Sequence, residues 1–195
     1  MLREKFKYHK IILASQSPRR QELLRGLDVD FEIETRPVDE NYDSKLKGTA
    51  ITDFLSTLKA KAFTDLAENT ILITSDTIVW LDDQALGKPK NEEEARAMLH
   101  QLSGRRHQVH TSVCFTTVDS QDVINDTTEV TFGKLNDQEI DYYVEKYRPF
   151  DRAGSYGIQD WLGFAKVTSI NGCYYNVMGL PLPKVYKFLT KLQIK

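Results

Sequence analysis

The sequence predicts a mixed α/β fold, and three observations carry this prediction. Short β-branched apolar runs, such as 11–14 and 70–76, alternate with segments whose apolar residues recur at helical spacing. Two longer extended runs, 109–118 and 123–132, are separated only by a polar turn over 119–122, which is typical of an antiparallel pair. Antiparallel elements within this order argue against a purely doubly wound sheet.

Capping residues and apolar periodicity place strands and helices alternately along the first half of the chain. Residues 1–10 form a frayed or helical lead-in. Ser17 is a good helix N-cap and Pro18 stands at the first helical position, which predicts a helix that ends near Leu27. The elements expected here are a strand over 11–14, that helix, a strand over 31–35, a helix over 49–66 and an extended run over 70–81.

The second half of the chain divides in the same way. Asn91 caps a helix whose first turn holds three glutamates, a placement that suits the helix dipole. Asn136 or Asp137 caps another helix, and the glycine- and aromatic-rich stretch 151–163 has no clear period. The elements expected here are a helix over 91–102, strands over 109–118 and 123–132, a helix over 136–147, a strand over 166–170 and a closing helix over 183–192.

Composition and charge narrow the class of protein. The chain has 195 residues, of which 41% are hydrophobic and 28% charged, so we expect one domain over 1–195 with residues 1–10 as an N-terminal extension. With 26 lysines and arginines against 28 aspartates and glutamates, the net charge is −2. This balance argues against a general binder of nucleic acid or of membrane surfaces, so any basic site must be local.

The cysteines and the hydropathy pattern indicate the compartment. Cys114 and Cys173 are the only cysteines and form no CxxC pair, which fits a reducing environment. Residues 1–10 have no apolar core of a secretory signal. No apolar run approaches the roughly 20 residues that span a bilayer. We therefore expect a soluble, cytoplasmic protein without a nucleic-acid or membrane partner.

The strand, turn and helix over 11–24 form the first candidate site. A helix N-terminus presents unpaired N–H groups and a partial positive charge, which suits an anion. Arg19 and Arg20 add fork-shaped donors that match phosphate oxygens, and Ser15 and Ser17 add hydroxyls. The glycines and the following lysine of a P-loop are missing. A well-capped helix with two solvated arginines therefore remains the alternative interpretation.

Asp76, at the end of an apolar run, is the best single candidate for chemistry. Ligand sites in α/β sheets gather at the carboxyl ends of strands. A carboxylate there can bind Mg²⁺ or accept a proton from water. Asp39 and Glu40 add an acidic pair on a loop. The alternatives are a capping aspartate at position 76 and ordinary loop acids at positions 39 and 40.

Three more polar residues suit a ligand that carries phosphates and a base. Lys88 is held in a Gly-Lys-Pro turn, where a lysine is useful against phosphate. Gln159 lies in a glycine-rich loop, and its amide can donate and accept hydrogen bonds at once, which suits a base edge. Lys59 lies on the predicted helix over 49–66. The alternatives are a solvated turn lysine at position 88, an ordinary loop amide at position 159 and a snorkelling helix lysine at position 59.

Five ordered stretches resemble the Maf family of nucleoside triphosphate pyrophosphatases. They are LASQSPRRQELL over 13–24, SDTIV over 75–79, LGKP over 86–89, AGSYGIQ over 153–159 and YNVMGLPL over 175–182. The match extends over about residues 11–192 and includes Val38-Asp39-Glu40 and Lys59-Ala60. Five motifs in order and at compatible spacing are far more specific than any one of them.

The resemblance implies an elongated, two-lobed mixed α/β fold with a central mixed sheet and a cleft between the lobes, related to the inosine triphosphate pyrophosphatases. It implies hydrolysis of a nucleoside triphosphate between the α- and β-phosphates, which gives the monophosphate and pyrophosphate. It also implies a divalent metal cation, Mg²⁺ or Mn²⁺, as cofactor, and a homodimer.

The resemblance also assigns roles by matching position. Asp76 would be the proton acceptor. The residues that would contact the phosphates are Ser15, Arg20, Lys59 and Lys88. Glu40 and Asp76 would hold the metal. The residues that would read the base, in the branch acting on dTTP and UTP, are Arg19, Thr77 and Gln159. A sister branch, acting on methylated GTP, carries an aromatic residue at the position of Arg19.

The base edge supports this assignment chemically. Thymine and uracil present an acceptor O4 beside a donor N3–H. The Gln159 amide can form hydrogen bonds with both, while Arg19 and Thr77 can donate to carbonyls. Guanine has a similar edge, so pocket size must exclude it. Asp160-Trp161 follows Gln159 where the family has a small residue. The carboxylate of Asp160 could repel phosphate, bind metal or point away from the site.

Modified pyrimidine nucleotides are further candidate substrates, and a nucleotide-sensing regulator is the alternative function.

Overall fold

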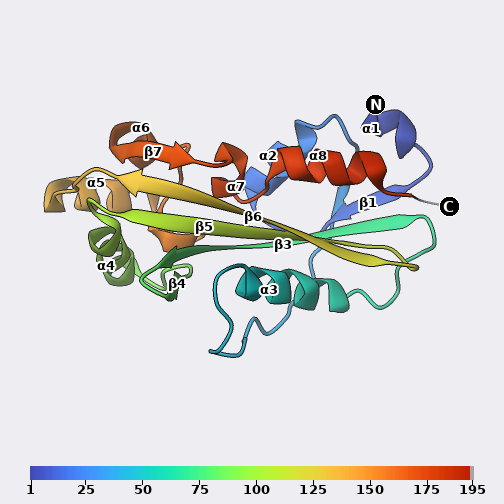
Figure 1. Ribbon diagram of the computed structural model, residues 1–195, viewed down its shortest axis with the longest axis horizontal. Helices are drawn as coiled ribbons and strands as arrows, with labels where there is room; N and C mark the ends of the chain where they lie inside the picture. The colour runs from blue at the N-terminus through green and yellow to red at the C-terminus, as the bar shows by residue number, and fades with distance from the viewer. Residues whose placement is uncertain (194–195) are drawn as a thin grey trace.

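Three long antiparallel strands run along the molecule in the computed structural model, which describes residues 1–193 (Figure 1). They are β3 (Thr70–Leu81), β5 (Arg106–Thr116) and β6 (Gln121–Phe132). β5 and β6 pair over their whole length, with Val113 opposite Ile124. The antiparallel pair predicted from the two extended runs is therefore confirmed.

Four shorter strands complete one mixed sheet. β1 (Lys10–Leu13) lies parallel to β3, and β2 (Glu32–Ile33) lies parallel to β1. At the other edge, β7 (Val167–Asn171) pairs with β6, which gives the order β2-β1-β3-β5-β6-β7. β4 (Gln84–Leu86) pairs with the last residues of β3. The prediction of a mixed α/β fold is confirmed.

β1 and β4 lie on the same side of β3 but leave a gap between them. β1 pairs with β3 from Thr70 to Ile73, and β4 pairs with it from Val79 to Leu81. Between these two contacts β3 has a strand neighbour, β5, on one side only among the described residues. Asp76 lies in this gap. The apolar run had suggested that Asp76 stands at the end of a strand, but it lies in the middle of β3.

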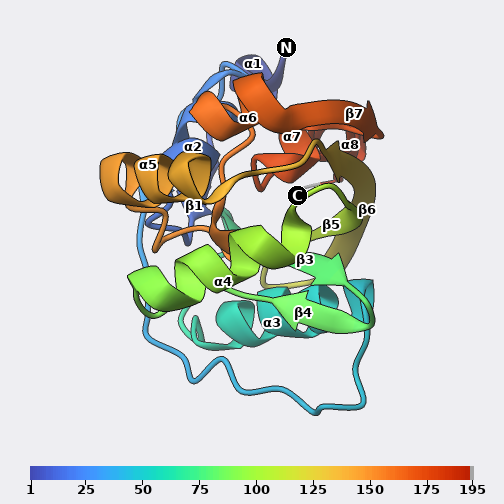
Figure 2. The same ribbon diagram turned by 90° about the vertical axis from the view of Figure 1, so that its left-hand side faces the viewer.

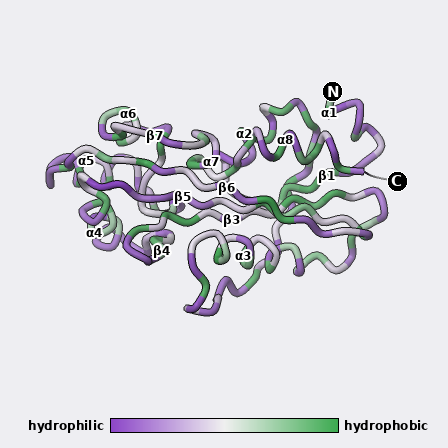
Figure 3. Tube along the Cα trace, in the orientation of Figure 1, coloured by the Kyte–Doolittle hydropathy of each residue, from purple (hydrophilic) through white to green (hydrophobic). Residues whose placement is uncertain are grey.

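Helices cover both faces of the sheet at the β1 end (Figures 1 and 2). α3 (Thr49–Lys61) covers one face. α1 (Leu2–Lys5), α2 (Pro18–Arg25) and α8 (Leu182–Lys191) cover the other. Both layers rest on strands that are largely hydrophobic at this end (Figure 3). The lead-in belongs to this core, since Leu2 and Phe6 are buried in it.

A second group of helices packs at the opposite end of the long strands (Figure 2). It comprises α4 (Glu92–Leu102), α5 (Asp137–Tyr147), the 3-10 turn η1 (Ala153–Ser155) and α6 (Trp161–Lys166). Their buried side chains form a separate cluster that includes Leu99, Tyr143 and Leu162. α7 (Tyr174–Val177) lies between the two groups. The elongated, two-lobed arrangement agrees with expectation.

Several boundaries differ from the predicted ones. The helix expected to reach residue 66 ends at Lys61, because Arg36 donates to the carbonyl oxygen of Ala62 (3.1 Å) and to Asp65 and so caps that end. The strand expected over 31–35 shortens to two residues. β4, α6 and α7 were not predicted, since elements of three to six residues are too short to show a period. No helix within residues 1–193 is long and apolar enough to cross a bilayer.

Candidate active site

A cavity of about 660 Å³ opens at the gap between β1 and β4. Side chains from both faces of the sheet reach it, because no strand closes that position. The structure brings all nine predicted site residues to its wall, although they come from distant parts of the chain. These residues are Ser15, Arg19, Arg20, Glu40, Lys59, Asp76, Thr77, Lys88 and Gln159.

The first turn of α2 forms one wall of the cavity. Ser17 has an extended backbone and accepts a long hydrogen bond from the N–H of Arg20 (3.5 Å), with Pro18 at the start of the helix, so the predicted N-cap is confirmed. The Ser15 hydroxyl accepts from the N–H of Ser17 (3.2 Å). The positive end of the helix therefore faces the cavity, where it favours an anion.

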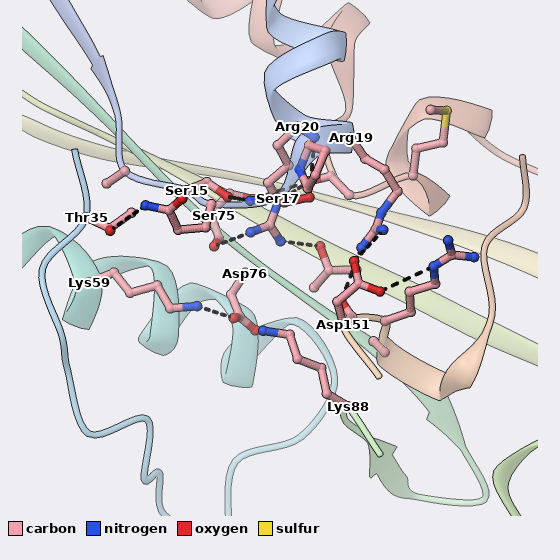
Figure 4. A pocket seen from close by; sticks show the side chains of 18 of the residues that line it. Ser15, Ser17, Arg19, Arg20, Thr35, Lys59, Ser75, Asp76, Lys88 and Asp151 are labelled. Carbon is pink, nitrogen blue, oxygen red and sulfur yellow. Dashed lines mark hydrogen bonds and ion pairs between the residues drawn. The ribbon is translucent and has the colours of Figure 1, made fainter. Parts of the chain in front are cut away.

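Two carboxylates meet one ammonium group on the opposite wall. Lys59 Nζ lies 2.6 Å from Asp76 Oδ1 and 3.3 Å from Glu40 Oε2. The Lys59 and Asp76 side chains are 17% and 10% exposed, whereas that of Glu40 is 48% exposed. Lys88 points toward Asp76 from the other side (Figure 4). Two lysines thus flank the carboxylate that stands in the gap of the sheet.

Arg20 is partly buried and bound to the protein on three sides. Its guanidinium donates to the carbonyl oxygens of Gly179 (2.9 Å) and Ser75 (3.0 Å) and to the hydroxyl of Thr77 (2.8 Å). Burial lowers the pKa of Arg20, and the charge of Asp76 opposes that shift. Arg20 therefore ties α2 to β3 and to the turn after α7. Two of its five N–H groups remain for a ligand, and its contact with phosphate stays a prediction.

Arg19 reaches across the cavity to a residue that the sequence did not single out. Its NH1 and NH2 groups donate to Asp151 Oδ2 (2.8 Å) and to the Asp151 carbonyl oxygen (3.1 Å). Burial alone would raise the pKa of Asp151, but the hydrogen bond and charge of Arg19 outweigh it, so the pKa is lowered. Asp151 lies in an irregular stretch far from Arg19 in the chain, and no sequence pattern connects the two.

The carboxylate of Asp160 turns away from the cavity. It forms an ion pair with Arg152 and accepts a hydrogen bond from the hydroxyl of Tyr143 (2.9 Å). That hydroxyl also accepts from the backbone N–H of Gly157 (3.0 Å). Of the three possibilities raised by the sequence, the structure supports the last, in which Asp160 points away. Its neighbour Gln159 lines the cavity with a buried Oε1 that has no hydrogen-bond partner.

The donor set fits a cation that arrives with its ligand. Within residues 1–193 no group of three or more His, Cys, Asp or Glu side chains could hold a metal ion. Glu40 and Asp76 nevertheless lie close enough to share Lys59 Nζ. Mg²⁺ is usually held by one or two carboxylates together with substrate phosphates. The carboxylates of Glu40 and Asp76, beside a wall that favours anions, match this mode of Mg²⁺ binding.

Comparisons with known proteins identify the family of the chain. Residues 10–192 match the family model described as "Maf-like protein". A dTTP/UTP pyrophosphatase of Flavobacterium psychrophilum is 55% identical over 190 residues and covers 97% of both chains. One of Bacteroides thetaiotaomicron is 50% identical over 186 residues and covers 94% of this chain and 96% of its own.

A solved structure shows the same fold at low sequence identity. The HAM1 protein from Coxiella burnetii superposes with a TM-score of 0.53 and is 18% identical, over 94% of this chain and 100% of its own. At that identity the likeness concerns the fold alone.

Proposed function

This chain belongs to the Maf-like protein family, and on that premise we propose that it is a pyrophosphatase that hydrolyses dTTP and UTP. The observation that carries the proposal is the convergence of cationic groups and a helix N-terminus around Asp76 in one cavity of about 660 Å³. That volume lies within the usual range of roughly 300–1,000 Å³ for small-molecule sites.

The cationic walls suit a triphosphate. A triphosphate carries about four negative charges, and a cation about 4 Å away contributes up to ~4 kcal/mol at an effective dielectric near 20. Lys59, Lys88 and the first turn of α2, with Ser15, border the same space. These groups would hold the phosphates and reduce the charge that otherwise repels an attacking water.

Asp76 would accept the proton of that water. Its Oδ1 is fixed by Lys59 at 2.6 Å, and its Oδ2 has no hydrogen-bond partner among the described residues. Water oxygen would bond to the α-phosphorus, the bond from that phosphorus to the bridging oxygen would break, and pyrophosphate would leave. The proton passes to Asp76 Oδ2. A positioned base of this kind contributes about 10²–10⁴ in rate.

A divalent cation, Mg²⁺ or Mn²⁺, completes the proposal. Glu40 and Asp76 would hold it together with the phosphates. When bound, it supplies charge neutralisation at the phosphate oxygens. Removal of the cation with EDTA should abolish turnover and Mg²⁺ should restore it, whereas full turnover in EDTA would contradict this part.

Arg19, Thr77 and Gln159 support a pyrimidine base as the group bound in the same cavity beside the phosphates. All three border it, and the buried Oε1 of Gln159 lacks a partner. An unpaired buried acceptor is unfavourable until a ligand donor reaches it. The N3–H of thymine or uracil, including modified forms of these bases, is such a donor.

The proposal includes a cytoplasmic location and a homodimer. Both cysteines, Cys114 and Cys173, are unpaired, which supports a reducing compartment. β7 is an edge strand of the sheet, and an unpaired edge can pair with that of a second copy. Analytical ultracentrifugation should show a species of twice the chain mass, and a monomer at every concentration would contradict the dimer.

Pyrophosphate release from a panel of nucleoside triphosphates tests the proposed activity. With Mg²⁺ or Mn²⁺ present, dTTP and UTP should be hydrolysed fastest, and ATP, GTP and CTP much more slowly. A preference for a purine nucleotide would contradict the base assignment. The absence of release from every nucleotide would contradict the enzyme itself.

A further inference from the structure

A chain of buried hydroxyl groups begins at the cavity wall and ends on α7. Thr77 on β3 lies directly opposite Thr111 on β5 in the strand register. Their hydroxyl oxygens are 3.0 Å apart, and Thr111 Oγ1 donates to the carbonyl oxygen of Asn176 at 3.0 Å. Thr111 and Asn176 are completely buried. The YNVMGLPL motif, which the proposed mechanism leaves without a role, contains Asn176.

The number of protons fixes the direction of these hydrogen bonds. A hydroxyl has one proton to donate and two lone pairs that accept. Because the proton of Thr111 goes to a carbonyl oxygen, the hydrogen bond between the two threonines must use the proton of Thr77. Arg20 NH2 donates to one lone pair of Thr77 at 2.8 Å. Thr77 therefore keeps one free lone pair and has no proton left to donate to a ligand.

We propose that Thr77 presents only an acceptor to the nucleotide and so selects bases that carry an N3–H, and that Thr111 and Asn176 are positioning residues that fix this polarity. The inference rests on the proposed function and names the class of base. It replaces the expectation that Thr77 donates to a carbonyl. It also assigns the single N3–H of the base to Thr77, so that the Gln159 amide, which can exchange its two ends, would turn its nitrogen to a base carbonyl. Uracil and thymine offer the N3–H, whereas cytosine has an unprotonated N3 that would face the acceptor.

Asn176 holds the receiving carbonyl in place. Its amide nitrogen donates both protons, to the carbonyl oxygen of Val109 and to the hydroxyl of Thr128, each at 3.0 Å. Thr128 is in turn saturated, because it donates to the carbonyl oxygen of Cys173 and accepts from the N–H of Cys173. α7 is thereby fixed to β5 and β6, and the acceptor for Thr111 cannot turn away.

Gln159 cannot supply this selectivity alone. A side-chain amide can rotate and exchange its donor and acceptor ends, so it can pair with uracil or with cytosine. Among the described residues no hydrogen bond fixes the amide of Gln159, whose Oε1 has no partner. Thr77, in contrast, is held by Arg20 and Thr111. A fixed polar group rejects a ligand of the wrong polarity far better than an adaptable one.

The ratio of kcat/KM for UTP to that for CTP tests the inference. In Thr111→Val the proton of Thr77 is released and can turn toward the cavity, so the ratio should fall roughly tenfold, the discrimination expected of one hydrogen bond. Thr111→Ser restores the hydroxyl and should restore the ratio. Thr74→Val is the matched control, since it removes a buried hydroxyl of β3 that donates to the carbonyl oxygen of Ser56 at 2.7 Å and lies outside the hydrogen bonds of Thr77, Thr111 and Asn176. Equal falls in Thr111→Val and Thr74→Val would overturn the inference.

A second variant decides the matter if Thr111→Val does not fold. Thr77→Val removes the acceptor, so the ratio of kcat/KM for UTP to that for CTP should fall, on top of any loss shared by both nucleotides because Arg20 loses its hydrogen bond to Thr77. An unchanged ratio would overturn the inference. Wild-type protein that releases no pyrophosphate would contradict the proposed function. Wild-type activity with an unchanged ratio in Thr111→Val would contradict only this inference.

Discussion

Arg19 and Asp151 form the contact that joins the two walls of the cavity. Arg19 comes from α2, and Asp151 precedes η1, so their hydrogen bonds of 2.8 and 3.1 Å cross the space that the base would enter. The Arg19 side chain is 17% exposed and that of Asp151 57%. The position of the guanidinium therefore depends on its partner as well as on α2.

A double-mutant cycle should show this coupling. Arg19→Ala and Asp151→Ala should each lower kcat/KM for UTP, and the double variant should lose little more than the worse single one. The expected coupling free energy is about 1–3 kcal/mol. Asp151→Asn, which keeps an acceptor, should lose less than Asp151→Ala. Losses that simply add in the double variant would show that Asp151 does not position Arg19.

His107 makes the stability of the protein sensitive to acid. It is 2% exposed, its Nε2 lies 2.8 Å from the hydroxyl of Tyr156, and burial lowers its pKa from 6.5 to about 4. Because the folded pKa lies below the unfolded one, the neutral ring contributes stability above pH 6.5, and this is lost as the pH falls toward 4.

Urea unfolding at pH 7, 5.5 and 4.5 measures the effect. Each proton of this kind contributes at most about 1.4 kcal/mol of unfolding free energy per pH unit. His107→Gln, which does not titrate, should be less stable at pH 7 but should lose less free energy on acidification than the wild type does. The same pH dependence in both proteins would assign the acid sensitivity to other groups.

At the scale of elements, the short helix α6 positions the loop that carries Gln159. Gly163 on α6 packs so closely that an added Cβ would collide with the carbonyl group of Ile158. Ile158 directly precedes Gln159, so a side chain at position 163 must displace the loop. The glycine is required by this close approach of two backbones, because its φ angle is ordinary.

Gly163→Ala should therefore lower both the unfolding free energy and the rate on UTP. Ala165→Gly on the same helix is the matched control, since Ala165 is exposed and the change costs only about 1 kcal/mol of helix propensity. Circular dichroism melts and pyrophosphate release would be measured for both variants. If Gly163→Ala behaves like Ala165→Gly, the contact with Ile158 does not matter.

The elements that the sequence could predict are those with a long period or a clear cap. Asn136, for example, forms a complete capping box with Glu139 at the start of α5. β4, α6 and α7 escaped prediction because three to six residues show no periodicity. The gap in the sheet at Asp76 escaped it too, since the gap depends on where two other strands stop pairing with β3.

The site could be predicted to the extent that its residues lie in recognisable motifs. Nine cavity-lining residues were found in this way. Asp151, Thr111 and Asn176 were not assigned roles, because each acts through a contact with a residue far away in the chain. Asp160 was recognised as a departure, but only its pairing with Arg152 shows where its charge goes. Contacts between residues that lie far apart in the chain can be identified only once the register of the sheet is known.

At the scale of the whole molecule, three long strands carry two packed lobes (Figure 1). The cavity lies between the lobes, where β3 has no neighbour between β1 and β4. The lobe at the β1 end supplies α2, and α3 supplies Lys59. The opposite lobe supplies the loop over 151–159. A ligand with phosphates and a base would contact elements from both lobes, which is why a long molecule with a central opening suits a nucleotide.

The products formed from UTP in ¹⁸O-labelled water, by the wild type and by Asp76→Asn, test this account most directly. We predict UMP that carries the label, together with unlabelled pyrophosphate, from the wild type. Asp76→Asn should bind UTP but turn it over about 10²–10⁴ times more slowly. UDP and phosphate as products, or a wild type that binds UTP without turnover, would contradict the account, and the second result would favour a nucleotide-sensing regulator.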